Sequence, residues 1–156
     1  MSGQIFEAVV KYFEEEHWKY LWVETAGETR LFTQMPRKNG DFLYMIRVRE
    51  EKDELVFYTY YEVKVPESKR QEAAAFFTQV NDGLTIGNFE MNMEDGEARF
   101  RMGVAVTDRP LTSSEIDHLV VSGLSTAEHY LPGLMAVIGG DEPLKGAMAL
   151  VEGAAA

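Results

Sequence analysis

The chain has 156 residues, with 15 Lys plus Arg against 26 Asp plus Glu, so its formal net charge is −11 with neutral histidines. A hydrophobic content of 46% is typical of a folded protein, and the length predicts a single domain over residues 1–152 with a frayed tail at residues 153–156. The negative charge and the lack of a basic cluster argue against nucleic acid or an anionic membrane surface as a partner. No apolar run approaches the ~20 residues of a membrane span, and no secretory signal is recognisable. The sequence has no cysteine, so we expect a cytoplasmic protein without disulfides, thiolate metal sites or cysteine nucleophiles.

The first segment has the period of an amphipathic helix. Apolar residues recur at spacings of three and four between Ile5 and Phe13, with charged residues between them. Ser2 is the expected N-cap, because its hydroxyl can accept a hydrogen bond from the first turn.

The next segment predicts strands. They are expected at residues 20–24, 30–35, 42–49 and 55–65. Pro36 is expected to end the second strand, and the third alternates strictly between apolar and other positions. Short turns join all four strands, which favours an antiparallel meander.

A second helix and a hairpin follow. Pro66 precedes a helix expected over residues 67–80, and Gly83 is suited to a left-handed residue at its end. Two alternating runs then flank Asp95-Gly96, a strong signal for a hairpin turn.

The last third is helical. Thr112 and Glu115 have the spacing of a capping box, Pro132 is expected to kink or split the helix, and Pro143 is expected to open a short final helix. The predicted order is therefore α-ββββ-α-ββ-α-α. We predict an α+β fold, a twisted antiparallel sheet with helices on one face.

The titratable residues do not have the spacing of a recognisable catalytic site. His118 and His129 are about three turns apart on one helix, too far to share a metal ion. Glu115 and His118 form one Glu-x-x-His spacing, whereas di-metal bundles need two such motifs. We therefore expect no enzyme activity, no metal site and no cofactor.

Four arginines alternate on two predicted strands: Arg47, Arg49, Arg99 and Arg101. If these strands were neighbours, the arginines could form a positively charged stripe that binds an anion. Pairing with nearby glutamates is the favoured interpretation.

Several segments together resemble the YbjN family over nearly the whole chain. They are residues 13–18, 65–70, 81, 86–91, 95–100 and 130–138. The resemblance implies a bacterial protein with a fold like that of class I type III secretion chaperones, usually self-associating. Family members are labelled sensory transduction regulators without an established reaction, so no catalytic residue carries over.

Two hypotheses for function remain. The first is a non-enzymatic, chaperone-like or regulatory protein-binding module that acts as a homodimer or larger homo-oligomer and binds another protein. A partner segment is predicted to bind along the sheet face away from the helices or at an edge strand. The residues predicted to bind it are Leu43, Met45, Tyr58, Tyr60 and Tyr61. The alternative is a small-molecule-sensing regulatory domain with a pocket between the sheet and the helices.

Overall fold

The computed structural model describes residues 3–37, 40–140 and 144–152. In chain order, its elements are α1 (Gln4–Glu15), β1 (Tyr20–Thr25), β2 (Glu28–Arg37), β3 (Gly40–Arg49), the 3-10 turn η1 (Glu50–Lys52), β4 (Glu54–Lys64), η2 (Glu67–Lys69), α2 (Arg70–Gly83), β5 (Asn88–Met91), β6 (Glu97–Ala105), α3 (Ser113–Gly139) and α4 (Leu144–Glu152). This order confirms the predicted α+β fold. The predicted tail at residues 153–156 lies outside the described residues.

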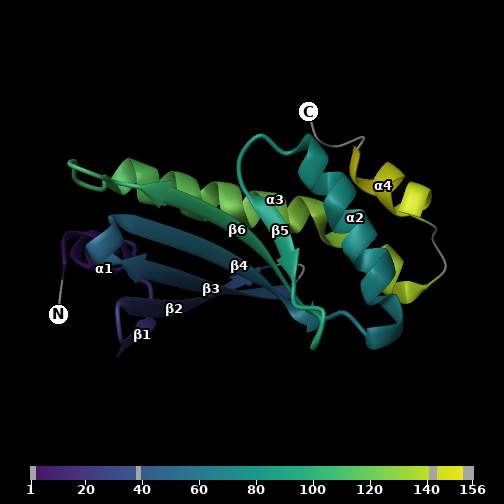
Figure 1. Cartoon of the computed structure of the whole chain (residues 1–156), viewed down its shortest axis with the longest axis horizontal. Coiled ribbons are helices and arrows are strands. Elements are labelled where there is room, and N and C mark those ends of the chain that lie inside the picture. Colours follow the sequence, from purple (N-terminus) through teal and green to yellow (C-terminus); the bar gives the residue numbers. More distant parts are fainter. Residues whose placement is uncertain (1–2, 38–39, 141–143, 153–156) are drawn as a thin grey trace.

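The strands form one six-stranded antiparallel sheet in the order β1-β2-β3-β4-β6-β5 (Figure 1). The first four strands make the predicted meander. The later hairpin adds to it through β6, which pairs with β4 and leaves β5 at the far edge. The two edge strands of the sheet are therefore β1 and β5.

The helices lie on one face of the sheet, as predicted (Figure 1). A single buried cluster joins that face to all four helices through Phe13 of α1, Phe76 of α2, Leu134 of α3 and Met148 of α4. In the figure, α4 lies outside the others, where it packs on α2 and α3. The core therefore fills the space between the sheet and the helices.

Strand β2 continues through Pro36, so the prediction that this proline ends the strand was wrong. Pro36 lies opposite Asp41 of β3. The partner strand β1 on the other side begins at Tyr20, opposite Thr33, so β2 is an open edge beyond Thr33. A proline without an amide hydrogen is tolerated at such an edge.

The end of α2 and the course of α3 can be compared with the predictions. Gly83 is still helical and does not have the left-handed conformation predicted for it. The helix ends instead at Leu84, which is extended. Helix α3 is one element that contains Pro132, so the proline does not split it. Pro143 lies outside the described residues, and α4 begins directly after it.

The predicted hairpin turn and capping box are both present. Gly96 has φ of 77°, and a Cβ atom there would lie 2.0 Å from the carbonyl oxygen of Val65. Only glycine fits both the positive φ and this close approach. At the start of α3, the Thr112 hydroxyl accepts from the Glu115 amide, and the Glu115 carboxylate accepts from the Thr112 amide.

Candidate functional site

The sheet face opposite the helices is the first candidate site, and we call it the open face. No helix in the described part of the chain packs on it. Leu43 and Met45 project there from β3, directly opposite Tyr60 and Tyr58 of β4. Four of the five residues predicted to bind a partner are thus neighbours on one surface.

Tyr61 is the exception, because it lies on the helix-covered face. Its side chain is 4% exposed, and its hydroxyl donates a hydrogen bond to the carbonyl oxygen of Ala127 at 2.6 Å. Burial raises the pKa of this phenol well above its usual value. Strand residues alternate between faces, so Tyr61 belongs to the core while Tyr58 and Tyr60 belong to the open face.

The centre of the open face is a small apolar cluster that is buried without a covering helix. Met45 is 8% exposed and Tyr58 is 4% exposed, packed with Val56, Phe32 and Tyr60. Arg99 covers this cluster, with its Cζ atom 4.2 Å from the centroid of the Tyr58 ring. Its Nη1 atom donates to the Tyr60 hydroxyl at 2.8 Å. A guanidinium stacked on an aromatic face both shields the ring and attracts it electrostatically.

Two groups of charged residues flank this apolar centre. In the Glu28 cluster, the carboxylate of Glu28 binds Arg30 of the same strand and Arg47 of β3, each at 2.5 Å. In the Glu90 cluster, Glu90 of β5 binds Arg99 at 2.7 Å and Arg101 at 3.1 Å.

Each cluster stabilises its carboxylate in the charged form. Burial by itself raises the pKa of Glu28, but the hydrogen bonds and charges of Arg47 and Arg30 outweigh it and leave the pKa below its usual value. The same balance holds for Glu90, where Arg99 and Arg101 outweigh burial and lower the pKa.

The arginines do not form the anion-binding stripe considered from the sequence. The two strands that carry them, β3 and β6, lie on either side of β4. Arg49 pairs with Glu54 of β4 at 3.1 Å, and the other three pair with Glu28 or Glu90. The favoured interpretation, pairing with glutamates, is confirmed.

Towards β1, the open face is apolar and exposed. Leu21 is 62% exposed, Val23 46% and Leu43 43%. Leu21 lies opposite Phe32, and these residues line a shallow hollow of about 300 Å³ that extends to Leu43. We call Leu21, Val23, Phe32 and Leu43 the exposed patch. Leu21 and Val23 were not among the residues predicted to bind a partner, although their alternation with Trp22 places them on one face.

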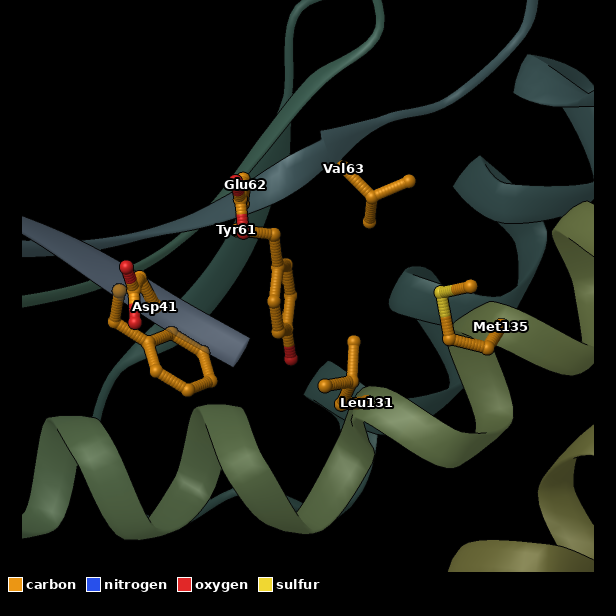
Figure 2. Close-up of a pocket in the computed structure, with 7 residues that line it drawn as sticks. Asp41, Tyr61, Glu62, Val63, Leu131 and Met135 are labelled. Carbon is orange, nitrogen blue, oxygen red and sulfur yellow. The ribbon is translucent and has the colours of Figure 1, made fainter. Parts of the chain in front are cut away.

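A second candidate is a hollow of about 230 Å³ between the sheet and α3. Its apolar walls are Phe42, Tyr61, Val63, Leu131 and Met135, with Asp41 and Glu62 also lining it. Figure 2 shows Tyr61 reaching from β4 towards α3, with Leu131 near the end of its ring and with Val63 and Met135 on the other side of the hollow. The pairing of β4 with β6 shifts register between Tyr60 and Lys64. Such a bulge bends the strand at this end of the hollow.

The histidines of α3 make separate contacts. His118 Nδ1 lies 3.4 Å from the Ser122 hydroxyl, and His129 Nε2 lies 2.8 Å from the carbonyl oxygen of Val151 in α4. Across residues 3–37, 40–140 and 144–152, no group of three His, Asp or Glu residues could hold a metal ion.

The comparisons with known proteins support the interpretation drawn from the sequence. The family model of YbjN, described as "Putative bacterial sensory transduction regulator", matches residues 6–135. The chain belongs to the YbjN family. Membership supports a regulatory or sensory-transduction role in bacteria. Among curated proteins, none matches the chain.

The fold of the chain is similar to that of a solved YbjN structure. The crystal structure of YbjN from E. coli, described as "a putative transcription regulator", has a TM-score of 0.54 and 12% sequence identity. The match covers 86% of this chain and 90% of that one. At this identity the similarity supports the fold alone. None of the helices that the structure describes is both long and apolar enough to cross a membrane.

Proposed function

We propose that this chain is a non-enzymatic regulatory module that binds an extended segment of another protein on its open face and works as a homo-oligomer. The observation that carries the proposal is the exposed patch, which continues into the buried cluster at Met45 and Tyr58. Exposed apolar surface of this kind marks interaction sites in soluble proteins. The family description names a regulator and no reaction, which supports the non-enzymatic part.

The charges around the patch favour a particular kind of segment. The Glu28 and Glu90 clusters each hold two arginines for one glutamate, so each carries a formal charge of +1 within a chain of net charge −11. An arginine beside a single carboxylate has further N–H donors to offer. The open face therefore suits a segment with apolar side chains and an acidic residue. A cytoplasmic location and the absence of nucleic-acid and membrane partners remain predictions from the sequence.

The test is a comparison of two exposed positions. Leu43→Asp changes the patch at a residue that is 43% exposed, while Val121→Asp changes an apolar residue of α3 that is 52% exposed. Affinity capture from native cytoplasm, read by mass spectrometry, should recover a partner with wild type and Val121→Asp but not with Leu43→Asp. Equal recovery by both variants would exclude the open face as the binding surface.

A second candidate function is the sensing of a small ligand in the hollow between the sheet and α3. The observation that favours it is the apolar lining of that hollow by Phe42, Tyr61, Val63, Leu131 and Met135. Its volume of about 230 Å³ lies below the range of about 300–1,000 Å³ common for drug-sized ligands. Any ligand there is therefore small. A thermal-shift screen against small apolar metabolites tests this function.

A further inference from the structure

The two edges of the sheet are protected very differently. At β5, the Asn81 side chain of α2 accepts from the Phe89 amide at 2.7 Å and donates to the Phe89 carbonyl at 3.0 Å. It therefore satisfies both backbone groups of the residue at the centre of this short strand. At β1, by contrast, no strand of the described chain pairs with the outer edge.

The middle of β1 is also apolar on both of its faces. Leu21 is 62% exposed and Val23 46% on the open face, and Trp22 is 49% exposed on the helix side, where its ring contacts Phe6 at 5.3 Å. Natural edge strands are usually shielded by lysine, proline, a bulge or a covering segment. None of these protective features occurs at Leu21, Trp22 and Val23. The backbone of this edge is therefore available to pair with another strand.

We propose that β1 pairs antiparallel with β1 of a second copy of this chain, in the register that places Trp22 opposite itself. The inference deepens the proposed function, since it specifies how the second copy of the proposed homo-oligomer binds. The proposed function requires a second copy but does not say how it binds. The inference adds that the copies meet at the β1 edge and in one register.

The register follows from symmetry. A two-fold axis perpendicular to the sheet keeps the open faces of both copies on the same side, so each residue must oppose one from its own face. Centring on Trp22 sets Leu21 of each copy opposite Val23 of the other, and the two Trp22 side chains meet on the helix side. Centring on Val23 instead opposes Leu21 to Thr25, which loses an apolar contact. Cross-strand apolar pairs stabilise a sheet, so the Trp22 register is preferred.

The same geometry limits the assembly to two copies. Pairing of β1 with itself uses the same surface on both copies and closes on itself. A β1 to β5 contact would continue indefinitely, but Asn81 occupies the β5 edge. In the dimer, the exposed patches of the two copies become one surface across the axis. Each copy thus contributes Leu21 and Val23 to the binding surface of the other.

Cysteine cross-linking tests the register, because the chain has no cysteine of its own. Directly opposed residues in antiparallel strands have Cα atoms about 4.5–5.5 Å apart, within the range a disulfide can bridge. Leu21→Cys mixed with Val23→Cys should therefore form a disulfide-linked dimer under mild oxidation. Val23→Cys alone should not, because the Cα atoms of its two copies would lie diagonally across the strand pair, about 8 Å apart and beyond the reach of a disulfide. Val121→Cys on α3 controls for random collisions.

The oligomeric state is measured separately by sedimentation. Wild type and the control Val121→Lys should be dimers. Val23→Lys places two lysines in each interface and should raise the dissociation constant about tenfold or more. A monomeric wild type, or self-cross-linking of Val23→Cys equal to that of the mixture, overturns the proposal. If wild type sediments as a monomer but still captures a partner, the β1 dimer and the homo-oligomeric part of the proposed function fail while its binding part stands, so the two failures are distinguishable.

Discussion

The carboxylate of Glu50 caps helix α1 from a distance of 44 residues. Its Oε1 atom accepts a hydrogen bond from the amide of Phe6 at 2.7 Å, and Oε2 accepts from the amide of Ile5 at 3.3 Å. The N-cap residue is Gly3, which has no side chain to cap the helix, so the prediction of Ser2 as the N-cap was wrong. A carboxylate at this end also interacts favourably with the helix dipole.

Removing this cap should destabilise the protein. Glu50→Ala leaves the first amides of α1 without their acceptor, and we expect the free energy of unfolding to fall by about 1 kcal/mol. Urea unfolding followed by circular dichroism measures the change. Glu51→Ala, an exposed neighbour in the same turn, is the control and should leave the midpoint unchanged. A similar midpoint for both variants would show that the contact does not stabilise α1.

Asn81 should protect the β5 edge. Asn81→Ala removes both hydrogen bonds to Phe89, which lies in the core at 3% exposure. We expect a loss of about 1–3 kcal/mol of stability, because partly buried backbone groups lose their partners. The specific readout is hydrogen exchange of the Phe89 amide, which should become faster. Gln79→Ala on the exposed side of α2 serves as the control, and unchanged exchange in Asn81→Ala would contradict the prediction.

Glu115 should make stability depend on pH in the acid range. Its hydrogen bond from Arg109 and that from the Thr112 amide lower its pKa to about 2. A carboxylate with a lowered folded-state pKa stabilises the fold above its unfolded pKa of about 4.3, and this contribution is lost as the pH falls towards 2. Glu115→Gln should thus be less stable than wild type at pH 7.

The difference between the two proteins should shrink as the pH is lowered through this window. Urea unfolding at pH 7, 4 and 2.5 measures it. The control is Glu67→Gln, which alters an exposed residue of the 3-10 turn before α2. A stability difference that stays constant from pH 7 to pH 2.5 would exclude the ionisation of Glu115 as its cause.

Filling the hollow beside Tyr61 should abolish any binding of a small ligand there. Met135 is 45% exposed and lines the hollow, so Met135→Trp adds bulk where a ligand would lie without disturbing the core. A ligand at 100 times its dissociation constant should stabilise wild type by about 2.7 kcal/mol. Thermal unfolding should show no such shift for the variant. Leu150→Trp, at another exposed apolar position, is the control and should respond as wild type does.

Part of the candidate site was predictable from periodicity. Alternation along β3 and β4 places Leu43, Met45, Tyr58 and Tyr60 on one face, and the structure brings them together. Tyr61 follows the same rule onto the other face, so its inclusion was an error in applying the pattern. The burial of Tyr58 was not predictable, because it depends on Arg99 of β6, a residue 41 positions further along the chain.

The order of helices and strands, the hairpin turn at Gly96 and the capping box of Thr112 and Glu115 follow from the amino-acid sequence alone. These features depend on neighbours within a few residues, whose spacing and turn chemistry can be read directly. Which strands became neighbours and which edge stayed open depended on tertiary contacts. The choice of Glu50 as the carboxylate that caps α1 depended on them as well. Such contacts join residues that are distant in the chain, and their geometry arises only when the whole sheet and its covering helices pack together.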